Sequence, residues 1–171
     1  MIDLVLGGNK SGKSDFALEL LSRTPQPWTF VATGKSKDLT FREQIMAHRQ
    51  SRNQDIAVVE ITTDLISVLG DLAAKGGGIL VDSLDFWLFS LYQCFPNMQD
   101  RSKITTACLD YLACWSAAPL ILVSTEMSLG PLTFDAEVRA FSRELGQLNR
   151  EIARLGTRVY LVIAGLAQQL K

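Results

Sequence analysis

The sequence lacks the features typical of secreted proteins with disulfides, of proteins with structural metal sites and of nucleic-acid-binding proteins. Only three cysteines occur in 171 residues, Cys94, Cys108 and Cys114, and their spacing matches no metal site. Their odd number favours free thiols in a reducing cytosol over a disulfide framework. The formal net charge is only -1, so no basic field attracts nucleic acid or an anionic membrane. We therefore expect a cytoplasmic protein with no nucleic-acid partner.

Long uninterrupted apolar segments are also missing. The first residues, Met1 to Asp3, lack the basic region of a signal peptide. The most apolar stretch, residues 78–95, is interrupted by Asp82 and Asp85. Carboxylates are costly at bilayer depth, so we expect a buried strand and helix here and no transmembrane segment.

Apolar residues nevertheless make up 47% of the chain and charged residues 20%, which is an ordinary globular balance. The length suggests one domain, residues 1–171, with a sizeable core. The predicted strands are short, continuous apolar runs, at residues 2–6, 28–32, 57–60, 79–81, 120–124 and, as the last strand, 158–164. The predicted helices cover residues 13–21, 40–52, 64–74, one or two segments within 84–116 that break near Pro96, and 134–155. Continuous apolar strands alternating with helices predict an α/β domain with a mostly parallel, doubly wound sheet.

The helix predicted at residues 134–155 has an apolar seam. Its members are spaced 3, 4, 3, 4 and 3 residues apart: Val138, Phe141, Leu145, Leu148, Ile152 and Leu155. Such a seam belongs to a helix that packs on the sheet or to one that contacts another subunit.

A phosphate-binding loop follows the first predicted strand. Its residues match the Walker A pattern: Gly7, Gly8, Asn9, Lys10, Ser11, Gly12, Lys13 and Ser14. Glycines allow backbone N–H groups to approach phosphate oxygens, and the following helix start adds partial positive charge. Lys13 can reach the β- and γ-phosphates, and Ser14 can ligate Mg²⁺. A strand before the loop and a helix after it complete the context of a three-layer P-loop NTPase-like fold.

Such a loop needs a carboxylate on the magnesium side, at the end of a neighbouring strand. Asp82 follows the apolar run 79–81 and is the candidate. The same aspartate could instead cap the next helix, and the two roles are compatible. With Ser14 it forms the expected Mg²⁺ site.

The only histidine, His48, lies in a polar segment with Arg49 and Arg52 nearby. On a helix, His48 and Arg52 share a face. Neighbouring arginines disfavour the protonated imidazole and can bind phosphate oxygens, which suits nucleophilic attack on phosphorus. By itself this pattern is weak and favours a surface histidine without a catalytic role.

Taken together, these motifs resemble the adenosylcobinamide kinase / adenosylcobinamide-phosphate guanylyltransferase family. The similar segments run through nearly the whole chain: residues 7–14, residues 30–34, His48 with Arg52 and Glu60, residues 82–84 with Trp87 and Leu88, residues 123–126 with Gly130, Arg139 with Phe141, Arg143, Gly146 and Asn149, and residues 159–166. The histidine segment and the helix with Arg139, Gly146 and Asn149 are more specific than the glycine-lysine loop.

The resemblance implies two reactions. ATP or GTP phosphorylates the hydroxyl of adenosylcobinamide, and His48 then takes GMP from GTP and passes it to the substrate phosphate. It also implies a homotrimer and nucleotide contacts beyond the loop, from Ala32, Thr33, Gly34, Arg49, Gln50, Ser51, Arg52, Glu60 and Asp82.

Several family positions differ here. Gln44 replaces an arginine, Ile56 a tryptophan and Thr125 an asparagine, and Met127, Ser128 and Ser90 also depart from the pattern. The loop, His48, Glu60 and Asp82 are retained. A divergent P-loop kinase of small molecules, or a nucleotide-sensing module without guanylyl transfer, are the alternative interpretations.

Overall fold

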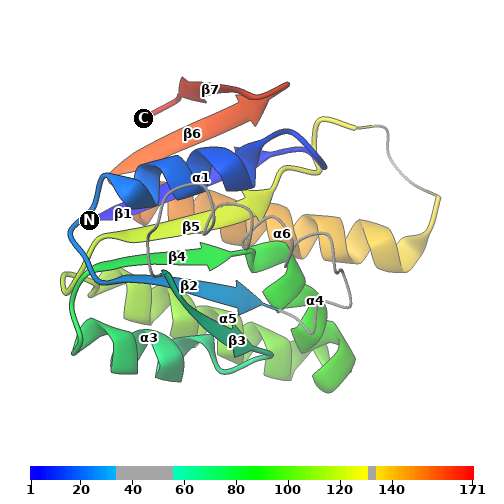
Figure 1. The fold of residues 1–171 in the computed structure, drawn as a ribbon. Coiled ribbons are helices and arrows are strands. Elements are labelled where there is room, and N and C mark those ends of the chain that lie inside the picture. Colours follow the sequence, from blue (N-terminus) through cyan, green and yellow to red (C-terminus); the bar gives the residue numbers. More distant parts are fainter. Residues whose placement is uncertain (34–55, 131–133) are drawn as a thin grey trace.

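The computed structural model describes residues 1–33, 56–130 and 134–171. Within them, one seven-stranded sheet carries helices on both faces, with strand order β3-β2-β4-β5-β1-β6-β7 (Figure 1). The elements are β1 (Ile2–Gly7), α1 (Lys13–Ser22), β2 (Trp28–Thr33), β3 (Ile56–Ile61), α3 (Leu65–Ala73), β4 (Gly78–Asp82), α4 (Leu84–Cys94), α5 (Met98–Ala113), β5 (Leu120–Thr125), α6 (Ala136–Leu155), β6 (Arg158–Ile163) and β7 (Leu166–Gln169). The predicted α/β fold with a mostly parallel sheet is confirmed. The helix predicted at residues 40–52 lies outside the described residues.

Side chains alternate between two apolar cores because successive strand residues face opposite sides of the sheet. On β5, Leu120 and Leu122 enter the larger core under α3, α4, α5 and α6, whereas Ile121 and Val123 enter the smaller core under α1. Both faces of the central strands are therefore covered, which explains their continuous apolar sequences.

The two edges of the sheet depart from this pattern. Ala57 and Val58 of β3 are exposed, because β3 is an edge strand that pairs only with β2. The strand predicted at residues 158–164 is present as β6, but it is not the last strand of the sheet. β6 ends at Ile163, a turn with positive φ at Ala164 (51°) and Gly165 (79°) follows, and β7 pairs back antiparallel to β6. All four residues of β7 are exposed, so no apolar run revealed it.

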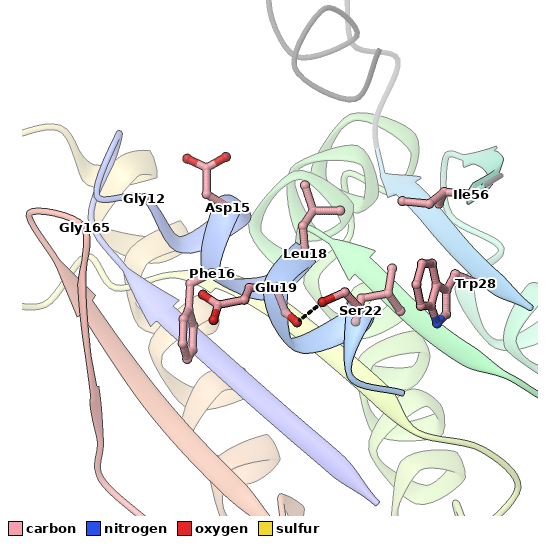
Figure 2. A pocket seen from close by; sticks show the side chains of 10 residues that line it. Gly12, Asp15, Phe16, Leu18, Glu19, Ser22, Trp28, Ile56 and Gly165 are labelled. Atoms are coloured by element: carbon pink, nitrogen blue, oxygen red, sulfur yellow. Dashed lines mark hydrogen bonds between the residues drawn. The ribbon is translucent and has the colours of Figure 1, made fainter. Parts of the chain in front are cut away.

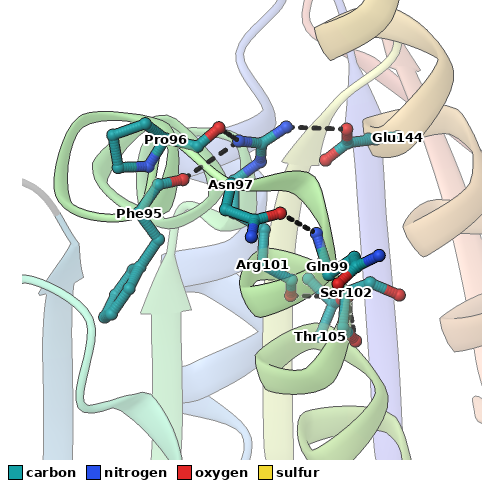
Figure 3. Close-up of polar contacts among 8 residues, drawn as sticks. All are labelled: Phe95, Pro96, Asn97, Gln99, Arg101, Ser102, Thr105 and Glu144. Atoms are coloured by element: carbon teal, nitrogen blue, oxygen red, sulfur yellow. Dashed lines mark hydrogen bonds and ion pairs between the residues drawn. The ribbon is translucent and has the colours of Figure 1, made fainter.

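The predicted break near Pro96 divides residues 84–116 into two helices, α4 and α5. The Asn97 side chain caps α5 by accepting a hydrogen bond from the Gln99 N–H at 2.9 Å. Arg101, only 7% exposed, donates to the carbonyls of Phe95 (3.0 Å) and Pro96 (2.8 Å) at the end of α4. It also forms an ion pair with Glu144 of α6 at 3.3 Å (Figure 3). One buried guanidinium thus joins three helices that support the same face of the sheet.

The apolar seam of α6 packs on the sheet only in part. Leu145, Leu148 and Ile152 are buried, whereas Val138 and Leu155 are 42% and 39% exposed. The helix begins at Ala136, because the Asp135 carboxylate caps it by accepting from the N–H groups of Glu137 (2.8 Å) and Val138 (3.0 Å). The central part of the seam therefore packs on the sheet, whereas its exposed ends remain compatible with a contact to another subunit.

The state of the cysteines and the length of the apolar helices can be compared with the expectations from the sequence. Cys94, Cys108 and Cys114 are all free, and Cys108 is buried. Burial raises the pKa of the Cys108 thiol to about 12, so this thiol is inert near neutral pH. In the part of the chain that the structure describes, no helix is long and apolar enough to span a membrane.

Candidate active site

The glycine loop between β1 and α1 presents an uncapped helix start. Gly12 precedes α1 with φ of 90°, in the left-handed region that favours glycine, and no described side chain caps the helix. The first N–H groups of an α-helix have no partner within the helix. At α1 they are therefore available, together with the positive end of the helix dipole, for an anion such as phosphate.

The loop is fixed by its neighbours on both sides. The Glu126 N–H donates to the Gly7 carbonyl at 3.1 Å, and the Gly165 N–H donates to the Ser11 carbonyl at 2.8 Å. A Cβ atom on Gly7 would collide with the Ser11 hydroxyl and the Val162 carbonyl. Close packing therefore requires glycine at this position, and the loop is held in place before any ligand binds.

Lys13 lies over this loop. Its ammonium group donates to the Gly8 carbonyl at 3.1 Å, so the side chain bends back toward the start of the loop. A phosphate held by the loop would lie within reach of this charge. The predicted residues Gly7 to Ser14 are therefore brought together as one anion-binding loop.

Asp82 ends β4, which is separated from β1 by β5. Neighbouring strands lie about 4.8 Å apart, so Asp82 and Gly7 stand roughly 10 Å apart across the sheet. Asp82 is 8% exposed, and its Oδ2 has no hydrogen-bond partner among the described residues. Burial raises the pKa of this carboxyl to about 6, opposed by a hydrogen bond with Ser14 and the charge of Lys13. The first turn of α1 therefore faces an incompletely satisfied buried carboxyl.

These residues fit a divalent cation of the magnesium type. Mg²⁺ is usually bound by one or two carboxylates together with water and substrate phosphates, rather than by a cage of protein ligands. The described residues contain no cluster of three or more histidine, cysteine, aspartate or glutamate side chains that could hold a metal. Asp82, with an unpartnered oxygen beside the Ser14 hydroxyl, supplies the sparse ligand set that Mg²⁺ uses.

Replacing Asp82 with asparagine is expected to stabilise the protein near pH 7 in the absence of divalent ions. The native carboxyl keeps its proton up to a pKa of about 6, whereas the unfolded one loses it near 3.8. The unfolded state therefore binds fewer protons between these values, so wild-type stability falls as pH rises from about 4 to 6. An amide cannot ionise, so Asp82→Asn should gain about 1–3 kcal/mol at pH 7. Urea unfolding of both proteins across this range measures the gain. A gain that is equally large at pH 3 would contradict this cause.

The predicted residues on β2 and β3 lie beside Asp82. Ala32 is aligned with Glu60 on one side and with Asp82 on the other. The buried Thr33 hydroxyl donates to the Ser83 carbonyl at 2.5 Å and accepts from the Ser83 N–H at 2.7 Å. Thr33 thus fixes the backbone directly after Asp82. The predicted site residues His48, Gly34, Arg49, Gln50, Ser51 and Arg52 lie outside the described residues.

A cavity of about 390 Å³ runs along the outer face of α1, from Gly12 and Gly165 to Trp28 (Figure 2). The carboxylates of Asp15 and Glu19 line it, and carboxylates repel phosphate groups. We therefore assign the phosphates to the loop and not to this cavity.

The sequence analysis did not select Asp85 as a site residue, although the structure brings its carboxylate to the end of β5. Its Oδ1 accepts a hydrogen bond from the Thr125 N–H at 3.2 Å. In the sequence, Asp85 could have been noticed only as a second carboxylate soon after the apolar strand at residues 79–81. That signal could not identify Thr125 as the partner, because the two residues are 40 positions apart.

An uncapped helix start, a lysine over the loop and a nearby buried carboxyl define a P-loop nucleotide-binding protein. The fold is similar to a solved structure described as a prototypical ATPase from the type III secretion system of pathogenic bacteria. The TM-score is 0.58 at 11% identity, over 94% of this chain and 50% of that chain. The chain thus spans about half the length of that protein, and the likeness concerns the fold alone.

The family model for cobinamide kinase / cobinamide phosphate guanyltransferase matches residues 3–170, and the chain belongs to this family. It is 32% identical over 173 residues to the bifunctional adenosylcobalamin biosynthesis protein CobP of Pseudomonas aeruginosa, covering 100% of this chain and 98% of the relative. It is 25% identical over 182 residues to the bifunctional protein CobU of Salmonella typhimurium, with 100% of both chains covered. The chain is therefore a transferase of cobalamin biosynthesis with cobinamide kinase and guanylyltransferase activity.

Proposed function

We propose that both reactions use the phosphate loop, with Lys13 as the phosphate-binding cation and His48 as the covalent carrier of GMP. The observation that supports this most directly is the convergence of Lys13, Ser14 and buried Asp82 at the uncapped start of α1. Phosphoryl transfer depends mainly on positioning and charge neutralisation, and this arrangement supplies both.

In the first reaction, the hydroxyl oxygen of adenosylcobinamide attacks the γ-phosphorus of ATP or GTP. The bond from that phosphorus to the bridging oxygen breaks, the nucleoside diphosphate leaves, and the hydroxyl proton goes to solvent or to a nearby base. The N–H groups of the loop and Lys13 orient the phosphates. Ser14 and Asp82 are the residues that would hold Mg²⁺, which supplies further charge neutralisation when bound.

In the second reaction, an unprotonated imidazole nitrogen of His48 attacks the α-phosphorus of GTP. A P–N bond forms and pyrophosphate leaves. A phosphate oxygen of the phosphorylated substrate then attacks the same phosphorus, the P–N bond breaks, and adenosylcobinamide-GDP is formed. Histidine suits this role because its unperturbed pKa leaves much of it neutral near pH 7. The proposed nucleotide contacts are Ala32, Thr33, Gly34, Arg49, Gln50, Ser51, Arg52, Glu60 and Asp82.

The proposal includes a single domain of residues 1–171, a cytoplasmic location and a homotrimer. The trimer is supported by the exposed ends of the α6 seam, where Val138 is 42% exposed and Leu155 is 39% exposed. Exposed apolar side chains beside a packed seam are suited to a contact between subunits.

Incubation with GTP and adenosylcobinamide, followed by mass spectrometry of protein and products, tests the proposal. We expect phosphorylated adenosylcobinamide, its GDP derivative, and protein heavier by one GMP. Phosphorylated product without GMP on either molecule would favour a divergent kinase. GTP binding without any transfer would favour a nucleotide-sensing module, and either result contradicts the bifunctional mechanism.

A further inference from the structure

At its carboxyl end, β5 is paired with β1 over more residues than with β4. β4 pairs with β5 only from Ile79–Val81 to Leu120–Leu122, whereas β1 pairs with β5 as far as Gly7 opposite Thr125. The Glu126 N–H donates to the Gly7 carbonyl. Backbone groups alternate in direction along a strand, so the N–H and C=O of Thr125 point toward the side that β4 no longer occupies.

Two side chains from different helices satisfy these groups. The Thr125 N–H donates to Oδ1 of Asp85, in the first turn of α4, at 3.2 Å. The Thr125 carbonyl accepts from Nδ2 of Asn149, on α6, at 3.1 Å. We call Asp85 and Asn149 the Thr125 clamp. Asp85 follows closely after the end of β4, so the clamp replaces the strand pairing that is missing between the ends of β4 and β5.

Asn149 is a buried polar side chain that donates a hydrogen bond to Thr125. Asn149 is 4% exposed and lies beside the apolar seam of α6, next to Leu148. Its Oδ1 has no hydrogen-bond partner among the described residues, and neither does the hydroxyl of fully buried Ser124. An apolar side chain here would avoid burying Oδ1 but would leave the Thr125 carbonyl without this donor. The polar side chain therefore points to a role at Thr125.

We propose that Asp85 and Asn149 are positioning residues for phosphoryl transfer. They hold Thr125, and through it Gly7 and the phosphate loop, at a fixed separation from Asp82. The inference rests on the proposed function of the loop, Ser14 and Asp82. In this proposal the clamp positions the reacting phosphate, while the affinity for the nucleotide comes mainly from the loop and Lys13.

Asn149→Leu removes the hydrogen-bond donor and keeps a similar volume. We expect the kcat of phosphoryl transfer to fall by about tenfold or more, since small displacements of reacting groups cost up to 10²-fold. The KM for GTP should stay within about twofold, because the loop contacts remain. The matched control is Ile152→Val, a buried apolar residue of α6 that cannot donate a hydrogen bond to Thr125, which should lower thermal stability and leave kcat unchanged. An unchanged kcat in Asn149→Leu would overturn the proposal.

Two variants of Asp85 distinguish the contribution of its hydrogen bond from that of its charge. Asp85→Asn keeps an oxygen acceptor for Thr125 and should keep most of the wild-type kcat, whereas Asp85→Leu should lose about as much as Asn149→Leu. The double variant Asp85→Leu/Asn149→Leu should be no slower than the slower single variant, because both changes release the same residue. Equal losses in Asp85→Asn and Asp85→Leu, or fully multiplying losses in the double variant, would contradict the clamp.

Hydrogen exchange provides a readout that does not need turnover. In Asn149→Leu, the amides of Thr125 and Glu126 should exchange faster than in wild type and in Ile152→Val. Unchanged exchange at both amides would overturn the clamp. Absence of phosphoryl transfer in the wild-type protein would instead refute the proposed function. The two failures are therefore distinguishable.

Discussion

Lys13→Ala is expected to abolish phosphoryl transfer and guanylyl transfer together while the protein stays folded. The Lys13 ammonium makes its hydrogen bond to the Gly8 carbonyl at an exposed site, at 3.1 Å, so its loss costs little stability. Both reactions require the triphosphate of a nucleotide at the loop. Removing one charge aimed at the transferring group typically costs 10²–10³-fold or more in rate.

Steady-state assays of each reaction, GTP binding by calorimetry and a thermal melt measure these effects. Lys103→Ala is the matched control, because it removes an exposed lysine of α5 that pairs with Asp100. That control should behave as wild type in every assay. Wild-type GTP affinity and turnover in Lys13→Ala would refute the assignment of the loop to phosphate binding.

His48→Ala is expected to remove guanylylation of the protein and formation of adenosylcobinamide-GDP, while largely sparing the kinase reaction. His48 is the only histidine of the chain, so no other imidazole can replace it. The kinase reaction depends on Lys13, Ser14 and Asp82 and needs no covalent intermediate on the protein. Radiolabel from α-labelled GTP retained on the protein, and phosphate transferred to adenosylcobinamide, measure the two reactions separately.

The chemistry of the label identifies the nucleophile. A phosphoramidate on histidine is labile in acid and stable in base, unlike a phosphate ester of serine. Wild-type label should therefore be lost in acid and survive in base. Acid-labile label that persists in His48→Ala would assign the nucleophile to another residue. Loss of both reactions in this variant would indicate that His48 positions the nucleotide and is not its covalent carrier.

The strand, loop and helix around Gly7 to Ser14 could be predicted from the local sequence. Gly7, Gly12, Lys13 and Ser14 are close in sequence, and the strand before them and the helix after them have strong apolar patterns. The residue types and their spacing predict this loop locally, although Glu126 and Gly165 hold it in place from distant parts of the chain. Asp82 could be selected as a candidate for a related reason, because it directly follows a short apolar run that predicts a buried strand.

Other features could not be predicted because they depend on residues distant in sequence. β7 has no apolar run, and only the turn at Ala164 and Gly165 brings it back to pair with β6. The hydroxyl of Thr33 bonds to the backbone of Ser83, 50 residues away. No local spacing encodes either partner.

The sequence by itself determined the class of fold, the phosphate loop and the carboxyl at the end of β4. Those features follow from the apolar period and from glycine, lysine and hydroxyl groups within single segments. Only the tertiary structure decided that β5 lies between β1 and β4, so that α1 has to bring Lys13 and Ser14 to Asp82. It also decided that Asp85 and Asn149 meet at Thr125. The physical reason is that buried parallel strands have similar compositions, so their order is set by how the connecting helices pack and not by the strands themselves.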